Sequence, residues 1–353
     1  MEERAYIEKL LEKLYRTDGA SDLIITTFKQ PQMRVYNELV SVGDEMLSPS
    51  ETESICKSIL SEEQLTRFEK NRELDMSLYI ERLCRFRINM YYQRGHMAMA
   101  VRVISSEIPG FEELGLPPVI ECFANLPRGL VLITGPVGSG KSTTVAAMID
   151  HINRTRHCHI VSIEDPIEFT HENKLATVDQ REVGIDTLSF SDALRCVLRQ
   201  SMDVVVVGEV RDHASAQAVM TLAETGHLTL ATLHTRGTVA SVNRLIDMFP
   251  EQQSQQVRSQ LSASLSGVLW QQLLPGREDI GGLVLGCEVL RATSAIRTMI
   301  KTGRGEEIYN AIQTGKQYQM VTMEQAVKDL SAKGLISEEY FQSSVQEKVG
   351  SFC

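Results

Sequence analysis

The first hundred residues combine the hydrophobic periods of helices and strands. Near the N-terminus, apolar residues spaced along one helical face precede a glycine and predict a helix: Ile7, Leu10, Leu11, Leu14 and Gly19. Short apolar runs on either side of Pro31 predict strands over residues 23–27 and 33–40. A helical period then covers residues 50–71, and we expect Ser50 and Glu53 to form its capping box.

Residues 84–91 show the most regular alternation of the chain. One predicted strand face carries Cys84, Phe86, Ile88 and Met90, and the other carries Arg85, Arg87, Asn89 and Tyr91. Residues 97–104 predict a neighbouring strand, and the prolines and glycines of residues 105–118 indicate a linker. The pattern therefore predicts a small α/β domain over residues 1–110 and a linker over residues 111–117.

Beyond residue 118 the apolar runs become continuous, and helical stretches separate them. Such runs are typical of parallel strands that are buried on both faces, and they cover residues 130–134, 160–163, 204–207 and 228–233. We therefore predict a doubly wound α/β domain over residues 118–292. A C-terminal helical appendage should follow over residues 293–353, with one helix between a Thr322–Gln325 cap and Gly334, and another that begins at Ser337.

A glycine-rich segment follows the first of these continuous runs. Residues 135–142 match G-x-x-x-x-G-K-[ST] between a predicted strand and a predicted helix, which favours a phosphate-binding loop over a simple glycine-rich turn. Backbone amides and the helix N-terminus would bind phosphate, Lys141 would reach the β- and γ-phosphates, and Ser142 would be a ligand of Mg²⁺. We predict that ATP and Mg²⁺ bind here, through Gly135, Pro136, Val137, Gly138, Ser139, Gly140, Lys141, Ser142 and Thr143.

Two glutamates follow other buried strands of the same predicted sheet. Glu164 ends the run over residues 160–163, and Glu209 follows the run over residues 204–207. Ligands of doubly wound sheets bind at the carboxyl ends of the strands. One acid could hold the metal while the other polarises the attacking water. Taken alone, either glutamate would more often be a solvated loop residue, but beside a phosphate-binding loop a role in the site is the better interpretation.

Two further pairs of residues are candidates for catalysis. His227 and His234 bracket the predicted strand over residues 228–233, so one of them could sense the γ-phosphate, although a lone histidine is usually structural. Arg85 and Arg87 share the polar face of an N-terminal strand. An arginine from another domain or subunit can neutralise charge in phosphoryl transfer. The alternative is that both arginines belong to a solvated strand face.

Composition argues against several classes of protein. The net charge of −10, from 36 basic and 46 acidic residues, disfavours nucleic acid as a partner. The seven cysteines are scattered and contain no C-x-x-C pair, which indicates reduced thiols with neither a disulfide framework nor a zinc site. The N-terminus lacks a signal pattern, and no apolar run approaches the ~18 residues of a membrane span. We expect a cytoplasmic protein that meets a membrane only through a partner.

The order of these segments resembles the secretion/pilus ATPase superfamily, and within it the PilT/PilU-like type IV pilus retraction ATPases. The similar segments are the phosphate-binding loop, an acidic box over residues 162–169, an atypical Walker B segment over residues 198–212 and a histidine box over residues 225–234. The resemblance implies a PAS-like N-terminal domain, a RecA-like ATPase domain with C-terminal helices, and a homohexamer with ATP at domain and subunit boundaries. It also implies Glu164 as the general base, Glu209 near Mg²⁺, and the N-terminal arginines as sensors or fingers.

The function that this resemblance implies is ATP-driven type IV pilus retraction, or twitching motility. The expected partner is an inner-membrane pilus platform protein at the inner face of the bacterial inner membrane, and a sister retraction ATPase is a further candidate. Residues 295–301 match the main retraction motor only in part, whereas residues 91–94 and 181–186 look more like the accessory PilU branch. Alternatives are a pilus-assembly or type II secretion ATPase, which typically carries a four-cysteine zinc insert absent here, and a weakly hydrolysing hexameric adaptor.

Overall fold

A computed structural model describes residues 2–36, 38–43, 45–81, 83–104, 107–277 and 282–337. The chain forms two compact units, Met1–Glu107 and Ile108–Cys353. The boundary between them lies close to the predicted domain end at residue 110. In the segment predicted as a linker, Leu116 is buried and Phe111 and Leu114 pack beside it, so this segment joins the core of the second unit.

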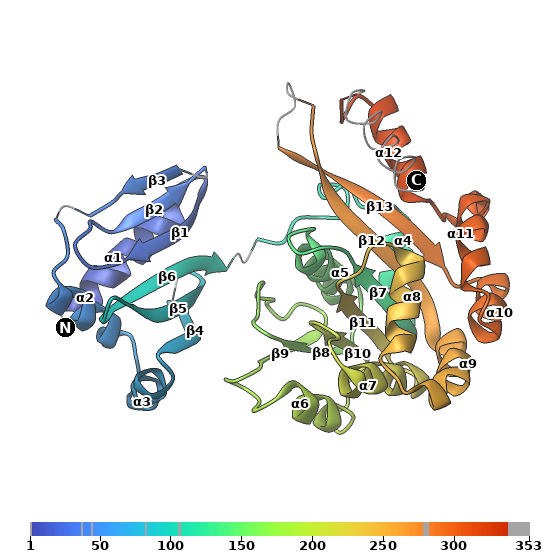
Figure 1. The fold of residues 1–353 in the computed structure, drawn as a ribbon, viewed down its shortest axis with the longest axis horizontal. Coiled ribbons are helices and arrows are strands. Elements are labelled where there is room, and N and C mark those ends of the chain that lie inside the picture. The colour runs from blue at the N-terminus through green and yellow to red at the C-terminus, as the bar shows by residue number, and fades with distance from the viewer. Residues whose placement is uncertain are drawn as a thin grey trace. The chain divides into compact units, whose positions relative to one another are not determined.

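The N-terminal unit is an antiparallel sheet with the order β3-β2-β1-β6-β5-β4, packed against helices (Figure 1). Its elements are α1 (Glu2–Arg16), β1 (Ala20–Ile25), β2 (Gln32–Val35), β3 (Glu38–Ser41), α2 (Pro49–Ser58), α3 (Glu62–Asn71), β4 (Glu73–Tyr79), β5 (Arg85–Gln93) and β6 (His96–Ile104). The alternation predicted for residues 84–91 is confirmed, because Phe86, Ile88 and Met90 are fully buried in the same core as Ile7 and Leu11 of α1.

Three predictions for this unit were wrong. The helix expected over residues 50–71 is two helices, because α2 ends at Ser58 and Ser61 caps the start of α3. The capping box of α2 is formed by Ser48 and Glu51 instead of Ser50 and Glu53, since Pro49 occupies the first helical position. The strand expected over residues 33–40 is a hairpin of β2 and β3, which turns near Tyr36.

The second unit has a seven-stranded sheet with the order β13-β12-β7-β11-β10-β8-β9 (Figure 1). Its strands are β7 (Gly129–Thr134), β8 (His159–Glu164), β9 (Thr177–Glu182), β10 (Val204–Val207), β11 (Leu228–Leu233), β12 (Leu265–Pro275) and β13 (Leu283–Arg291). Its helices are α4 (Val119–Ala124), α5 (Lys141–Thr155), α6 (Phe190–Val197), α7 (His213–Glu224), α8 (Thr238–Asp247), α9 (Ser254–Ser264), α10 (Ser294–Thr302), α11 (Gly305–Gln313) and α12 (Met323–Ala332). All neighbouring strands are parallel except β12 and β13.

Helices cover both faces of this sheet, as the continuous apolar runs predicted. Alternate residues of β7, β8 and β10 belong to two separate hydrophobic cores, one with α4 and α5 and the other with α6 to α11. Among the C-terminal helices, α10 and α11 contribute Ile296, Ile300, Ile308 and Ile312 to the second of these cores. The Thr322–Gln325 cap of α12 is confirmed. The helix expected to begin at Ser337 lies outside the described residues.

A membrane-spanning helix was not expected, and within the described ranges no helix is long and apolar enough to cross a bilayer.

Candidate active site

The glycine-rich loop connects the end of β7 to the first turn of α5. Gly138 and Gly140 have φ values of 75° and 83°, a backbone conformation that favours glycine. Gly135 is required for space, because a Cβ atom there would lie 2.3 Å from the backbone oxygen of Gln271 on β12. The Gln271 side chain also donates to the Ser139 carbonyl at 2.7 Å, so β12 helps to hold the loop in this conformation.

Lys141 is the first residue of α5, and its ammonium group turns back into the loop. Its Nζ donates to the carbonyls of Gly135 and Pro136 at 3.0 and 2.7 Å. Burial lowers the pKa of Lys141, and the charges of Glu209 and Glu168 oppose that shift. The ammonium therefore lies where the loop amides and the helix N-terminus favour a phosphate.

Glu164 ends β8 and is held by two neighbouring polar side chains. Its Oε1 accepts hydrogen bonds from Ser162 Oγ at 2.6 Å and from Gln180 Nε2 of β9 at 3.1 Å. Burial raises the pKa of the Glu164 carboxyl, while these two hydrogen bonds and one from the backbone of Glu168 lower it. A carboxylate whose pKa is raised toward neutrality suits a general base.

Glu209 follows the neighbouring strand β10 through Gly208. A Cβ atom at Gly208 would lie 3.0 Å from the Ile163 oxygen and 3.2 Å from Glu164 Cα, so a larger residue here would press on the backbone at the end of β8. The Gly208 carbonyl also accepts a short hydrogen bond from the Thr232 hydroxyl of β11. The two predicted acids thus lie at adjacent strand ends, as expected.

His234 links Glu209 to the phosphate-binding loop. Its Nδ1 lies 3.3 Å from Lys141 Nζ, and its Nε2 lies 3.5 Å from Glu209 Oε1. Because the lysine ammonium can only donate, Nδ1 must accept, and the ring proton of neutral His234 is then on Nε2, facing Glu209. A histidine in this position connects the loop lysine to the acid after β10.

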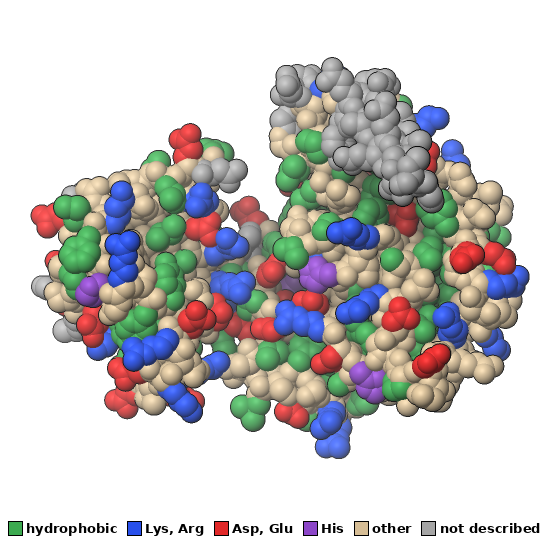
Figure 2. All heavy atoms as spheres, viewed as in Figure 1, with side chains coloured by type: hydrophobic (Ala, Val, Ile, Leu, Met, Phe, Trp, Pro, Cys, Tyr) green, Lys and Arg blue, Asp and Glu red, His purple; other side chains and the backbone are tan. Residues whose placement is uncertain are grey.

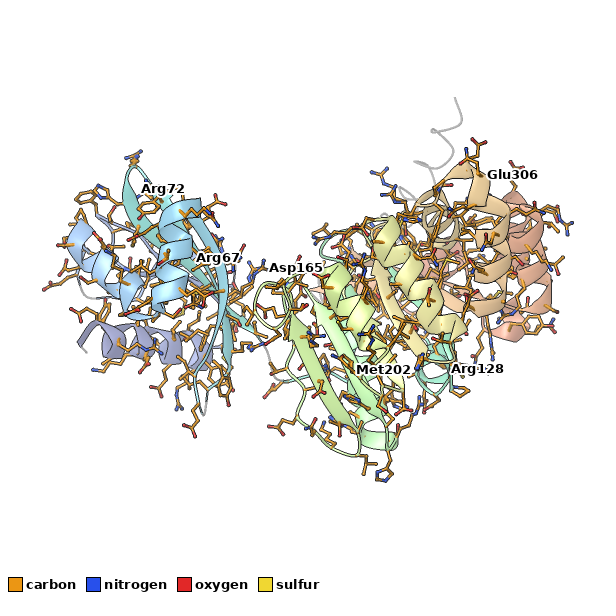
Figure 3. The ribbon with its side chains drawn as sticks, turned by 90° about the horizontal axis from the view of Figure 1, so that it is seen from below. Arg67, Arg72, Arg128, Asp165, Met202 and Glu306 are labelled. Atoms are coloured by element: carbon orange, nitrogen blue, oxygen red, sulfur yellow. The ribbon has the colours of Figure 1, made fainter. Side chains whose placement is uncertain are left out.

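Sequence reasoning missed Arg211. Its guanidinium forms an ion pair with Glu209 at 2.8 Å and reaches Asp165, the residue after Glu164, at 3.5 Å. Asp165 lies just beyond the end of β8 (Figure 3), and Figure 2 shows acidic, basic and histidine side chains intermingled on one face of this unit. The signal was Arg211 itself, two residues after Glu209, but its second partner, Asp165 in the loop after β8, could be found only from the fold.

The remaining predicted residues lie elsewhere in the chain. His227 is at the opposite end of β11 from His234, about 20 Å away along the strand, and contacts Thr225 and the Leu222 carbonyl. His227 therefore does not contact the phosphate-binding loop of its own chain. Arg85 and Arg87 lie on β5 in the N-terminal unit, where Arg87 is directly opposite Arg102 of β6. The roles of His227, Arg85 and Arg87 stay predictions.

Comparison with known proteins places this arrangement in a family. Residues 7–348 match the family described as Type II/IV secretion system protein. The chain belongs to that family. Among curated members, the chain is 42% identical to the type IV pilus retraction ATPase PilT of Pseudomonas aeruginosa, over 91% of this chain and 93% of that protein. It is 38% identical to the type IV pilus ATPase PilU of the same organism, over 94% of this chain and 86% of that protein.

Solved structures of family members have the same fold. The crystal structure of the pilus retraction motor PilT with bound ADP matches with a TM-score of 0.88 and 41% identity, over 96% of this chain and 95% of that one. The Legionella pneumophila ATPase DotB matches with a TM-score of 0.85 and 26% identity, over 98% and 96% of the two chains. These matches confirm the predicted fold class, a PAS-like α/β domain followed by a RecA-like ATPase domain.

The donor atoms near the loop fit a magnesium ion. Mg²⁺ prefers oxygen ligands and usually binds through one or two protein oxygens together with substrate phosphates. The Ser142 hydroxyl is in the first turn of α5, and the Glu209 carboxylate is connected to the loop through His234. Within the described part of the chain, no cluster of three or more acids, histidines or cysteines could hold a metal alone.

Proposed function

We propose that this chain is a motor that hydrolyses ATP to ADP and phosphate and uses that energy for type IV pilus retraction. The single observation that carries the proposal is the meeting of four separate segments at one sheet edge: the loop with Lys141, the acid Glu164, the acid Glu209 and the histidine His234. Similarity to PilT over nine-tenths of both chains supports the retraction function.

In the proposed reaction, Lys141 and the loop amides bind and orient the triphosphate. The oxygen of an attacking water forms a bond to the γ-phosphorus while its proton passes to Glu164. The bond between the γ-phosphorus and the bridging oxygen breaks, and its electron pair leaves with ADP. His234, between Lys141 and Glu209, is placed to respond when the γ-phosphate is lost.

Ser142 and Glu209 would hold Mg²⁺, which when bound neutralises charge on the β- and γ-phosphates. Arg211 competes for the same Glu209 carboxylate through its 2.8 Å ion pair. Arg85 and Arg87 could supply a positive charge to the site from their domain or from a neighbouring subunit. His227, which does not reach its own loop, would likewise act only in a neighbouring subunit.

The proposed assembly is a homohexamer at the inner face of the bacterial inner membrane, with a pilus platform protein as its partner and without nucleic acid. The type II secretion ATPases of the family are weaker candidates, because the protein HxcR of Pseudomonas aeruginosa matches only 56% of this chain and 45% of its own length. An accessory role beside a sister retraction ATPase is a second candidate, which rests on the 38% identity to PilU, below the 42% identity to PilT.

The substitution Glu164→Gln tests the proposed base. It preserves the shape of the side chain but removes the proton acceptor, so the variant should bind ATP normally and hydrolyse it at least about 100-fold more slowly. Nucleotide affinity, melting temperature and turnover should be measured on the same preparation. A normal rate in the folded variant would show that Glu164 is not the base.

A further inference from the structure

The side chain of Gln180 makes three hydrogen bonds that bring the acidic box together. Its Nε2 donates to the Phe169 carbonyl at 2.7 Å and to Glu164 Oε1 at 3.1 Å, and its Oε1 accepts from the His171 amide at 2.8 Å. Gln180 lies on β9, directly opposite Ser162 of β8. A single amide thus contacts both the acid and the loop that follows it.

The orientation of this amide is fixed by the backbone. The Phe169 carbonyl can only accept a hydrogen bond, and the His171 N–H can only donate one. The two ends of the Gln180 amide are therefore not interchangeable. Because Nε2 must face Phe169, its second hydrogen is available to Glu164, and the contact with the carboxylate follows from the loop geometry.

Ser162 completes the arrangement. It is fully buried on β8, two residues before Glu164, so both side chains point to the same side of the strand. Its hydroxyl donates to Oε1 at 2.6 Å, the same oxygen that Gln180 contacts. Two donors on one oxygen fix the rotation of the carboxyl group and direct the other oxygen, Oε2, away from them.

We propose that Gln180 is a positioning residue, which together with Ser162 holds Oε1 of Glu164 so that Oε2 takes the proton of the attacking water. This inference rests on the proposed role of Glu164 as the base. Both donors also favour the ionised carboxylate, the form that a general base must have. Gln180 itself touches neither substrate nor reacting atoms in this scheme.

Other charged groups face Glu164 and remain in place when Gln180 changes. Asp165 and Glu168 are on its own loop, where the backbone of Glu168 also donates to the Glu164 carboxyl, and Glu182 is its direct neighbour on β9. Beyond the end of β10 lie Glu209 and Arg211, and the first turn of α5 carries Lys141. Burial lowers the pKa of His171 to about 4, so this histidine stays neutral at the pH values of an activity assay.

The substitution Gln180→Met tests the proposal in the full-length assembled protein. Losing a donor to the carboxylate raises the pKa of Glu164. When ATP turnover is plotted against pH, the acid limb, where the rate falls as Glu164 is protonated, should therefore move to higher pH by about one unit. Ser162→Ala should move it in the same direction, and Ser162→Thr, which keeps the hydroxyl, should restore it. The KM for ATP should stay nearly constant in all of these variants.

Lys174→Met is the matched control. Lys174 holds the same loop to α5 through Asp150 at 2.5 Å, so its loss loosens the loop without removing a donor to Glu164. The control should leave the acid limb where it is. If Gln180→Met fails to fold, Gln180→Glu keeps the acceptor for His171, loses the neutral donor and should shift the limb at least as far.

The possible outcomes separate this proposal from the proposed function. A shifted limb in the Gln180 variant and an unshifted limb in the Lys174 variant would support it. A slower Gln180 variant with an unchanged limb, or one with normal turnover, would overturn the positioning role even if Glu164→Gln is inactive. Normal turnover in Glu164→Gln would instead refute the base assignment itself.

Discussion

A methyl group at Gly208 should disturb the site at the point where its two acids approach each other. The Cβ atom of Gly208→Ala would lie 3.0 Å from the Ile163 oxygen and 3.2 Å from Glu164 Cα. Both are backbone atoms, so neither can rotate away. Two hydrogen bonds also hold Gly208 in place: its N–H donates to Ile163 O at 2.8 Å, and its carbonyl accepts from the Thr232 hydroxyl.

The expected cost has two parts. Inserting a methyl group into a packed region typically destabilises by about 1–3 kcal/mol, which lowers Tm by about 2–4 °C per kcal/mol in a unit of this size. Relieving the contacts should separate β8 and β10 by a few tenths of an ångström. Since a 1 Å misplacement can cost about 100-fold in rate, roughly 0.3 Å should reduce single-turnover hydrolysis about four-fold.

Gly286→Ala is the control for this prediction. Its Cβ atom would lie 2.9 Å from Leu274 Cδ1 and 3.1 Å from Met323 Sδ, which are flexible side-chain ends on the far side of the same sheet. The control should lower Tm by a similar or smaller amount and leave hydrolysis unchanged. A Gly208→Ala protein with wild-type Tm and wild-type turnover would refute the claim that close packing at Gly208 sets the geometry of the acids.

Four further substitutions test other parts of the account. Lys141→Ala should abolish ATP turnover in a folded protein, as measured by hydrolysis and Tm, and comparable turnover would contradict its role. Arg85→Ala and Arg87→Ala should each change stability by no more than about 0.5 kcal/mol but slow hydrolysis about 10³-fold; unchanged rates in both and in the double variant would show a merely solvated strand face. Glu288→Ala should lower the unfolding free energy by about 2–4 kcal/mol in denaturant titrations, since buried Glu288 accepts from Thr238 and from the Met323 amide; an unchanged midpoint would contradict this.

Local patterns predicted the elements that carry the chemistry. The continuous apolar runs predicted the parallel strands, because a strand that is buried on both faces needs apolar residues at successive positions. Glu164 and Glu209 could be placed near the loop, since the carboxyl ends of parallel strands share one edge. The two acids are neighbours because β8 pairs with β10, and that strand order is a property of the whole fold.

Predictions failed where local signals competed. Ser48 and Ser50 are both good caps, and Pro49 decides between them by favouring the first helical position. Within residues 50–71, Ser61 and Gln64 form a second capping box, and this local signal, which the helical period alone does not show, separates α2 from α3. The contacts of Gln180 and Arg211 depend on neighbouring strands and on loop closure, so no spacing in the sequence indicated them.

The central claim, that this chain converts ATP hydrolysis into pilus retraction, is tested most directly by measuring retraction in cells. A strain that lacks the chain should be complemented with the wild-type chain or with Glu164→Gln, at matched protein levels, and single-pilus retraction should be recorded. The account predicts that the wild-type chain restores retraction and that the Glu164→Gln chain does not. Equal retraction with both chains, or no loss of retraction in the uncomplemented strain, would contradict it.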